Sequence, residues 1–446
     1  MEKLFGTDGI RAVAGQPPLD YSSVYVLGKA LISLLKEKKL EPRVIIGRDT
    51  RESGEWLEQA LFQGINEGWG EAVSAGIIPT SAVSFLTKKY SFSAGIVISA
   101  SHNLYQDNGI KIFSSEGIKI SDAWERKLEK AVTKAPSNIK RESIRIIPRS
   151  SLGQDYMDFL KSQFSHINLK RKIKVVLDCS NGASSFFASQ VFSDLNFEVI
   201  VMGNTPDGKN INASCGSLYP QELARKVVES KADIGIAYDG DADRAIWIDE
   251  KGRILNGDHT LFVLSRFMKE KGRLKSDYVI ATTMSNMGLE KAIEKLDLKL
   301  LRTQVGDKYV LEEMMKLKAN LGGEQSGHTI FLDDCPTGDG ILTSLKMLEA
   351  IVAYDLPLSK LVEDMEEFPQ ILLNVPVRKK IDFDQFPEII ITKEEIEKRL
   401  GNSGRLNVRY SGTEPVARVM IEGQDKGKIE DYARQLADII SKHLGN

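Results

Sequence analysis

The sequence predicts an α/β protein with three α/β domains, each with a mixed sheet, and a smaller C-terminal α+β domain. Three observations support this prediction. Short apolar runs alternate with stretches of helical periodicity, several of these runs end in polar loops rich in Gly or Asp, and the pattern changes near residue 370. The chain has 446 residues, which is too long for one ordinary hydrophobic core.

The individual elements follow from apolar spacing. Short apolar runs predict strands at residues 43–47, 94–99, 173–178, 197–202, 234–237, 245–248 and 278–282. Apolar residues spaced by three and four predict helices at 24–36, 53–66, 221–229, 308–317 and 342–353. Near the C-terminus, strands are expected at 371–377, 406–410 and 416–421, followed by a helix at 428–443. Because ligands in open α/β sheets bind where strands end, the polar loops after these strands are the places to seek chemistry.

Three breaks in the pattern suggest the domain boundaries. These are a polar segment at 134–149, a turn-rich segment at 249–257 and a charged stretch at 378–384. The expected domains are 1–150, 151–252, 253–369 and 370–446, each carrying one polar loop of interest.

Composition narrows the class of protein. The formal net charge is −2, so no basic excess points to nucleic acid. The three cysteines are odd in number and widely spaced, which fits a reducing compartment better than a disulfide framework. The first residues lack the apolar core of a signal peptide, and no run approaches the ~18 apolar residues of a membrane span. We therefore expect a cytoplasmic protein that binds neither nucleic acid nor membrane.

The first loop of interest contains Ser101 in the run Ser99-Ala100-Ser101-His102-Asn103, directly after an apolar strand. A serine on such a loop is exposed to ligands, and free backbone amides there bind anions. A capped turn is the simpler interpretation, since Ser and Asn favour turns. A hydrolase triad is not indicated, because the Gly-x-Ser-x-Gly elbow is missing.

The second loop, Asp239-Gly240-Asp241-Ala242-Asp243-Arg244, places three carboxylates at alternate positions. Such oxygens suit Mg²⁺ or Ca²⁺. The calcium-hand spacing matches at the three aspartates and at Glu250, but Arg244 occupies the glycine position and the flanks predict strands. A calcium hand is therefore rejected. Arg244 beside the aspartates suits a phosphate near the metal.

Two further loops offer ligand-binding groups. Gly322-Gly323-Glu324-Gln325-Ser326-Gly327-His328 brings directed hydrogen-bonding groups close to a ligand, as sugar hydroxyls require. Arg409-Tyr410-Ser411-Gly412-Thr413-Glu414-Pro415, with Arg418 after it, forms a plausible phosphate cradle. A polar loop and a hairpin turn are the simpler interpretations. Arg11 and Arg48 stand in two other short loops, where a single arginine is usually an ordinary surface or ion-paired residue.

Taken in order, these loops resemble those of the α-D-phosphohexomutase family, from Phe5 to Arg418. The resemblance implies four domains around a central cleft, each contributing one loop. It implies a phosphorylated Ser101 that donates its phosphoryl group to a bound sugar monophosphate. The resulting sugar 1,6-bisphosphate turns over and returns its other phosphate to Ser101, so the same bisphosphate also serves as activator.

The resemblance also assigns roles to residues. Mg²⁺ would be held by Asp239, Asp241, Asp243 and an oxygen on Ser101; the sugar would be read by Glu324, Gln325, Ser326 and His328; the non-reacting phosphate would be held by Arg409, Ser411, Gly412, Thr413 and Arg418. Lys111 stands where the family places a lysine near the reacting oxygen, Arg11 matches an arginine that faces the phosphoserine, and His102 completes the catalytic candidates. The general base stays open among Lys111, His328 and, more weakly, Asp307. A lysine would need a lowered pKa, which burial can supply. A homodimer is common among the enzymes that the chain resembles.

Four segments resemble the bacterial amino-sugar branch of the family, which interconverts glucosamine 6-phosphate and glucosamine 1-phosphate on the route to UDP-N-acetylglucosamine and the cell wall. They are 5–11, Asn210-Ile211-Asn212 with Cys215-Gly216-Ser217, Val305-Gly306-Asp307 with Tyr309-Val310, and 323–328. Leu104 replaces the usual proline after Ser-His-Asn, which predicts a less rigid loop. Asn256 replaces a more common aspartate. A glucose or mannose phosphate mutase and a non-catalytic sugar-phosphate sensor are the alternatives.

Overall fold

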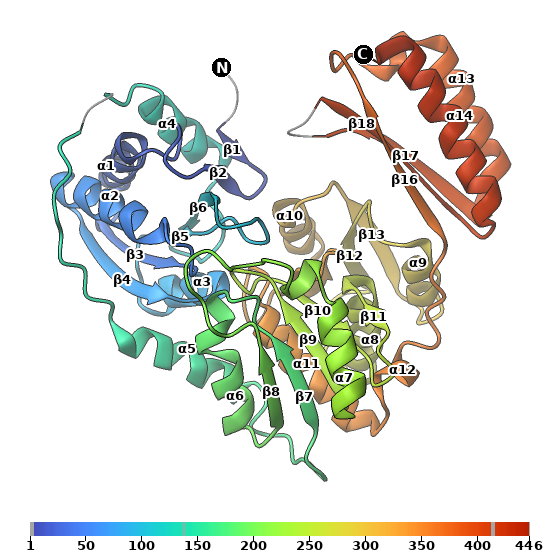
Figure 1. Ribbon diagram of the computed structural model, residues 1–446, viewed down its shortest axis with the longest axis horizontal. Helices are drawn as coiled ribbons and strands as arrows, with labels where there is room; N and C mark the ends of the chain where they lie inside the picture. The colour runs from blue at the N-terminus through green and yellow to red at the C-terminus, as the bar shows by residue number, and fades with distance from the viewer. Residues whose placement is uncertain (1–3, 137–138, 412–414, 446) are drawn as a thin grey trace. The chain divides into compact units, whose positions relative to one another are not determined.

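The computed structural model describes residues 4–136, 139–411 and 415–445, and Figure 1 traces the chain. The chain divides into two compact units. One comprises Met1–Thr282 with Leu301–Glu363, and the other comprises Thr283–Leu300 with Asp364–Asn446. We describe each unit by itself.

The first sheet carries the serine loop. Its strand order is β1-β2-β6-β5-β3-β4, from β1 (Phe5–Gly6), β2 (Gly9–Val13), β3 (Arg43–Arg48), β4 (Glu71–Ile77), β5 (Ala94–Ile98) and β6 (Asp107–Ser114). β3 pairs in parallel with β4 and β5, whereas β6 runs antiparallel to β5 and β2. The helices of this region are α1 (Tyr21–Glu37), α2 (Gly54–Glu67), α3 (Thr80–Lys89) and α4 (Asp122–Val132).

Helices cover both faces of this sheet. α1, α2 and α4 bury their apolar residues in one cluster with strand residues such as Val44 and Ile96. α1 and α2 pack very closely, because a Cβ at Gly64 would lie only 2.0 Å from the carbonyl oxygen of Tyr25. α3 lies against β3 and β5, where Val83 contacts the backbone of Gly47. The strand end that carries Ser101 is thus fixed from both sides.

The second sheet carries the aspartate loop. Its order is β11-β10-β9-β7-β8, from β7 (Lys174–Asp178), β8 (Glu198–Met202), β9 (Ile234–Tyr238), β10 (Ala245–Ile248) and β11 (Ile254–Leu255). β7 is parallel to β8 and β9, and β9 turns back antiparallel into β10. The helical segments are α5 (Ser150–Ser162), η1 (Ala183–Phe186), α6 (Ala188–Asp194), η2 (Gly216–Leu218) and α7 (Gln221–Ser230). The three aspartates occupy the tight turn between β9 and β10.

The third sheet carries the glycine-rich loop. Its order is β13-β12-β14-β15, from β12 (Tyr278–Thr282), β13 (Lys299–Thr303), β14 (Leu321–Gly323) and β15 (Thr329–Phe331). β12 is parallel to β14, and β14 is antiparallel to β15. The helices are α8 (Gly257–Glu270), α10 (Asp307–Leu317), α11 (Gly340–Tyr354) and α12 (Leu358–Leu361). Glu324 to His328 form the hairpin between β14 and β15.

The other unit contains a fully antiparallel sheet of order β16-β18-β17. Its strands are β16 (Gln370–Pro376), β17 (Gly404–Tyr410) and β18 (Val416–Gly423), and its helical segments are α9 (Met287–Glu294), η3 (Phe383–Gln385), α13 (Pro387–Leu400), η4 (Gly401–Ser403) and α14 (Lys426–Leu444). α13 and α14 share one apolar core with the sheet. The predicted fold class, three mixed α/β sheets and a small C-terminal α+β domain, is confirmed.

The three cysteines form no disulfide. Cys179 and Cys335 are buried and Cys215 is half-buried. Burial raises the pKa of each thiol to about 12. Among the described residues, no helix combines the length and apolar character needed to cross a membrane.

Candidate active site

Ser101 lies at the carboxyl end of β5 and is fully buried. Its backbone has φ +52°, a left-handed conformation that L-residues rarely adopt. Its Oγ donates to Asp239 Oδ2 at 2.6 Å and lies 3.3 Å from Nδ1 of His102. The serine loop and the aspartate loop therefore meet, although they are far apart in the sequence. Ser101 and His102, neighbours in the chain, do bring their side chains together.

The three aspartates converge on one point. One oxygen of each of Asp239, Asp241 and Asp243 lies within 4.8 Å of the others, and all three residues are buried. Asp241 Oδ1 and Asp243 Oδ1 are buried without a hydrogen-bond partner. Hard oxygen donors that lack partners in a buried cluster fit a divalent cation such as Mg²⁺. Ser101 Oγ, already bonded to Asp239, lies beside the same cluster.

The three aspartates repel one another, so nearby positive charge is needed to keep them ionised. Burial, with repulsion from Asp243 and Asp241, raises the pKa of Asp239 well above its ordinary value. Burial also opposes ionisation of Asp243, but Lys111, His328 and Arg244 together outweigh it and hold the pKa of Asp243 well below its usual range. Carboxylates this close repel one another unless cations offset them.

Lys111 on β6 supplies one such cation. Its Nζ lies 2.9 Å from Asp241 Oδ2 and 3.0 Å from Oδ2 of both Asp243 and Asp8. Burial favours the neutral amine, yet the surrounding carboxylates raise the pKa of Lys111 well above its ordinary value. A lysine that serves as a general base would need a lowered pKa, which burial alone could supply, but the three carboxylates around this amine raise its pKa. Lys111 is thus a cation among these three carboxylates.

Three further side chains lie beside Ser101 or beside the carboxylates near it. Burial, followed by the charge of Arg244, lowers the pKa of His102 to about 4, so its imidazole is neutral at pH 7. Arg244 lies 3.7 Å from Asp243 Oδ1, and Arg11 pairs with Asp8. The Nε atoms of both arginines are buried without a hydrogen-bond partner. These donors suit an anionic group held beside the serine.

The hairpin of the third sheet packs directly against the aspartate loop. Arg244 and His328 form an isolated antiparallel bridge, and the amide of Ala245 donates to the carbonyl of Gly327 at 3.2 Å. Glu324 is buried, and burial raises its pKa. Its Oε1 accepts from the amide of Gly306 at 3.1 Å. A carboxylate held in this way keeps one oxygen for another donor.

The other residues of this hairpin differ in their surroundings. Gln325 Nε2 donates to Asp258 Oδ2 at 3.1 Å, whereas Ser326 is exposed. His328 is buried, and its Nε2 accepts from the amide of Gly338 at 2.9 Å. Its Nδ1 lies 3.7 Å from Asp243 Oδ1. Both ring nitrogens of His328 thus face groups of the protein.

Asp307, at the start of α10, is drawn into a chain of ion pairs. Lys119 Nζ lies 2.6 Å from both Asp307 Oδ2 and Asp8 Oδ1. Asp8 in turn contacts Lys111. Charge alternates from the third sheet to the aspartate cluster. Sequence reasoning gave no role to Lys119, which has no motif signal of its own, or to Asp8, although Asp8 stands in the segment 5–11 together with Arg11.

Arg51 is the second omission. Arg48, the last residue of β3, pairs with Glu55 and Glu58 on α2, as expected of an ion-paired arginine. Arg51, three residues on, is fully buried and donates to backbone carbonyls of the serine loop. The two arginines belong to one short motif. The sequence does not show that Arg48 faces α2 whereas Arg51 faces the serine loop.

The predicted phosphate loop lies in the other unit. Arg409 and Arg418 are directly opposite each other on β17 and β18. Burial, followed by the charge of Arg418, lowers the pKa of Arg409. Lys380 Nζ donates to the carbonyl of Ser411 at 2.7 Å, which adds a cation that sequence reasoning missed. Gly412 and Thr413 lie outside the described residues.

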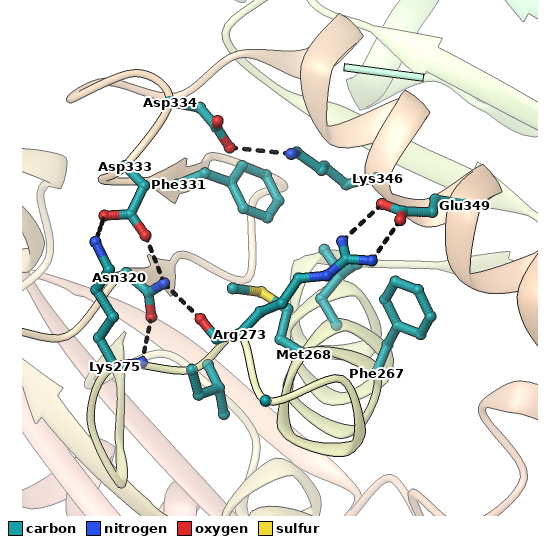
Figure 2. A pocket seen from close by; sticks show the side chains of 13 residues that line it. Phe267, Met268, Arg273, Lys275, Asn320, Phe331, Asp333, Asp334, Lys346 and Glu349 are labelled. Carbon is teal, nitrogen blue, oxygen red and sulfur yellow. Dashed lines mark hydrogen bonds and ion pairs between the residues drawn. The ribbon is translucent and has the colours of Figure 1, made fainter. Parts of the chain in front are cut away.

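A cavity of about 370 Å³ in the first unit offers a contrast. Figure 2 shows that its charged side chains pair with one another, and that apolar side chains such as Phe267 also line the cavity. Arg273 binds Glu349 at 3.1 and 2.6 Å, and Lys346 lies 3.1 Å from Asp334. Because these charges are already paired, the cavity lacks the partnerless donors and acceptors of the serine and aspartate loops.

Four domain models of one known family match successive parts of the chain. Residues 2–138, 154–252, 256–368 and 372–439 match, in order, the α/β/α domains I, II and III and the C-terminal domain of phosphoglucomutase/phosphomannomutase. The chain belongs to the phosphoglucomutase/phosphomannomutase family. As a member of this family of phosphohexomutases, it is an isomerase-type phosphotransferase.

Relatives of this phosphohexomutase carry a narrower name. It is 46% identical to a phosphoglucosamine mutase of Koribacter versatilis, over 100% of this chain and 98% of the relative. A phosphoglucosamine mutase of Caldicellulosiruptor saccharolyticus is 44% identical, over 100% of both chains.

Solved structures share the fold of this phosphohexomutase. A phosphoglucomutase/phosphomannomutase family protein from Burkholderia thailandensis superposes with TM-score 0.81 at 22% identity, over 99% of this chain and 97% of that one. An N-acetylphosphoglucosamine mutase of Aspergillus fumigatus, in complex with GlcNAc-6P and magnesium, superposes with TM-score 0.70 at 19% identity, over 98% and 95%.

Proposed function

We propose that this chain interconverts glucosamine 6-phosphate and glucosamine 1-phosphate through a phosphorylated Ser101 and a sugar 1,6-bisphosphate. The observation that carries the proposal is the hydrogen bond of 2.6 Å from Ser101 Oγ to Asp239 Oδ2. It lies in a buried cluster of three carboxylates. Support for the amino sugar comes from the relatives at 46% and 44% identity, both named phosphoglucosamine mutase. The reaction belongs to the route toward UDP-N-acetylglucosamine and peptidoglycan precursors.

The proposed metal is Mg²⁺, held by Asp239, Asp241, Asp243 and an oxygen on Ser101. When bound, Mg²⁺ supplies positive charge that offsets the negative charge of the transferring phosphoryl group. The partnerless oxygens of Asp241 and Asp243 support this assignment. Lys111 supports it as well, because a cation is already needed to hold these carboxylates together.

The side chains around Ser101 divide the work of phosphoryl transfer. Arg11 and Arg244 hold the phosphoryl oxygens through their free Nε–H groups. Lys111 stabilises negative charge or donates a proton to the leaving oxygen of Ser101. His102, neutral and 3.3 Å from Oγ, accepts a proton when Ser101 is rephosphorylated.

The sugar is read from the hairpin after β14. Glu324 keeps one carboxylate oxygen for a sugar hydroxyl or for the amino group, while Gly306 holds the other. Ser326 is exposed to ligand, and Gln325 and His328 hold the hairpin in shape through Asp258 and Gly338. Arg409, Ser411, Gly412, Thr413 and Arg418 hold the phosphate that is not reacting.

The first experiment is a coupled assay for glucosamine 1-phosphate, starting from glucosamine 6-phosphate with Mg²⁺ and a trace of sugar bisphosphate. We expect turnover well above that on glucose and mannose phosphates, and none for Ser101→Ala, which lacks the acceptor hydroxyl. Ser33→Ala on α1 is the control for a lost hydroxyl, since Ser33 is exposed and its Oγ donates to the carbonyl of Lys29, outside the site loops.

The outcomes separate the alternatives. Equal or better turnover of glucose or mannose phosphates would keep the family and discard the amino-sugar assignment. Normal turnover by Ser101→Ala would end the phosphoserine proposal. Absence of both turnover and phosphoserine in the intact mass would favour a non-catalytic sugar-phosphate sensor.

We also propose a cytoplasmic location and a homodimer, with a small sugar phosphate as ligand and neither nucleic acid nor membrane as partner. The unpaired cysteines support a reducing compartment. The dimer rests only on resemblance, and sedimentation of the purified chain tests it.

A further inference from the structure

We propose that Arg51 and Asn212 are positioning residues that together hold Ser101 in its left-handed conformation, so that Oγ stays aimed at the aspartate cluster. This inference rests on the proposed function, in which Ser101 accepts and donates the phosphoryl group. It gives a role to the segment Asn210-Ile211-Asn212, which none of the proposed ligand contacts uses.

We call Arg51 and Asn212 together the clamp. Its first half is Arg51, whose side chain is fully buried. Its Nε binds Asp49 Oδ2 at 2.8 Å. Its Nη2 donates to the carbonyls of Ser101 at 3.0 Å and Asn103 at 2.8 Å, and its Nη1 donates to those of Asp107 at 3.0 Å and Leu104. All five N–H groups of the guanidinium are used, so its orientation is fixed. The loop that lacks the usual proline is held through the Leu104 carbonyl instead.

The second half of the clamp is Asn212, which lies between β8 and α7. Asn212 is buried, and its Nδ2 donates to the carbonyl of Ser101 at 2.8 Å and to that of Asn103 at 2.9 Å. The carbonyl of Ser101 thus accepts one bond from each side. Asn212 has φ +56° itself, a conformation that asparagine tolerates better than most residues.

The aspartate loop closes the arrangement. A Cβ at Gly240 would lie 2.6 Å from the Ser101 carbonyl oxygen and 2.8 Å from Asn212 Nδ2, so only glycine fits there. Thr50 Oγ1 also donates to the Asn181 carbonyl at 2.5 Å, which ties the Arg51 loop to the Asn212 region. With its carbonyl fixed from both sides, Ser101 keeps Oγ 2.6 Å from Asp239. Small errors in such a position cost large factors in transfer rate.

The test uses Asn212→Gly, which keeps the left-handed backbone accessible but removes both donors. We expect kcat to fall by roughly 10-fold to 100-fold while KM changes by less than about two-fold, since the sugar-reading hairpin is untouched. The rate at which sugar bisphosphate phosphorylates Ser101 in a single turnover, followed by intact mass, should fall by the same factor. Asn196→Gly is the control, because Asn196 is an exposed left-handed asparagine in the same domain.

Arg51→Lys repeats the test from the other side, because it keeps the charge but loses the planar fork. Wild-type rates of Ser101 phosphorylation in a folded Asn212→Gly or Arg51→Lys would overturn the clamp. Loss of the folded circular dichroism spectrum in both variants would assign these contacts to the fold alone and overturn it too. A wild-type chain that takes no phosphate on Ser101 would instead remove the proposed function and this inference together.

Discussion

At the scale of single residues, side chains outside the proposed metal site orient a carboxylate inside it. Asp241 accepts from Thr80 Oγ1 at 2.6 Å and from Lys111 at 2.9 Å, so a helix of the first sheet orients a carboxylate of the second. Partners of this kind commonly contribute a factor of about 10 to 100 in metal affinity.

Thr80→Val should therefore raise the Mg²⁺ concentration for half-maximal activity by about 10-fold or more, because Asp241 loses the bond that orients it. Thr80→Ser keeps the hydroxyl and should stay near wild type. Titration of activity with Mg²⁺ measures both. An unchanged Mg²⁺ requirement in Thr80→Val would show that Lys111 alone is enough to orient Asp241.

Asp339 gives a residue-scale prediction about pH. It is buried at the start of α11, where it accepts from the amide of Leu342 and from Tyr156, each at 2.9 Å. Burial raises its pKa to about 6 from an ordinary 3.8. A raised folded-state pKa favours the protonated group, so its contribution to stability is present below the unfolded pKa and is lost as pH rises to about 6.

Asp339→Asn removes this titration and keeps one oxygen for the amide of Leu342, while its NH2 group replaces the oxygen that accepts from Tyr156, so the Tyr156 hydroxyl must accept there instead. The stability of wild type relative to this variant should fall as pH rises from about 4 to about 6 and then stay level. Urea midpoints of both proteins, measured in parallel across that range, provide the comparison. A constant difference between the two midpoints would show that Asp339 keeps an ordinary pKa.

At the scale of elements, the start of α8 holds the hairpin between β14 and β15, the proposed sugar site. Asn256 caps this helix, its side chain accepting from the amide of Asp258 at 3.0 Å. The next residue, Gly257, donates its amide to the carbonyl of Gln325 at 2.9 Å. The replacement of a family aspartate by Asn256 therefore keeps the cap, since both residues serve well there.

Gly257→Ala should damage substrate binding. A Cβ at that position would meet the Glu324 carbonyl oxygen at 2.0 Å, so the hairpin must move. We expect kcat/KM to fall by about 100-fold, the usual scale for a displacement of about 1 Å. Gly427→Ala in α14 is the control, because only one ordinary contact at 3.5 Å awaits its Cβ. Unchanged kinetics would mean that α8 yields instead of the hairpin.

Prediction from sequence succeeded where elements are regular. The apolar runs at 43–47, 234–237 and 278–282 are strands within one residue of their predicted ends, because buried strands need continuous apolar residues. α3 was not predicted, since its buried residues include the polar Ser81, Ser84 and Thr87 among its apolar ones. β6 begins with Asp107-Asn108-Gly109, which reads as a turn. Both elements gain their partners only from the assembled fold.

The loops of the site were predictable, but the ion pairs and hydrogen bonds between them were not. Ser101 and the three aspartates stood out because their residue types and spacing carry chemistry directly. Lys119, Asp8 and Arg51 act through contacts with residues distant in sequence, and no local pattern marks such contacts. The direction of the Lys111 pKa depended on which carboxylates surround it, which only the structure supplies.

At the scale of the whole molecule, residues 283–300 interrupt one unit and belong to the other. Asn286 exchanges two hydrogen bonds of 2.9 Å with the backbone of Phe368. Buried Glu422 accepts from the amide of Met287 at 3.1 Å and pairs with Arg405, which also donates to the carbonyl of Thr283 at 2.9 Å. This segment should open together with the C-terminal sheet.

Arg405→Ala should test this coupling. We expect faster amide hydrogen exchange in α9 and in β17, with β3 and β5 unchanged, because the lost guanidinium joins α9's segment to the C-terminal sheet. Arg434→Ala, which removes an exposed pair with Glu430 within α14, is the control. Exchange in α9 that stays at the wild-type rate would show that Asn286 and Glu422 hold the segment without Arg405.

The protected thiols make the molecule a convenient object for fluorescence. Maleimide dyes react with thiolates, and with pKa values near 12 the native cysteines offer almost none at neutral pH. Val228→Cys on α7 and Ile391→Cys on α13 would place reactive thiols at exposed positions, one in each compact unit. A donor and acceptor dye on this pair would report the separation of the two units in solution, with and without sugar phosphate, while every native cysteine stays in place.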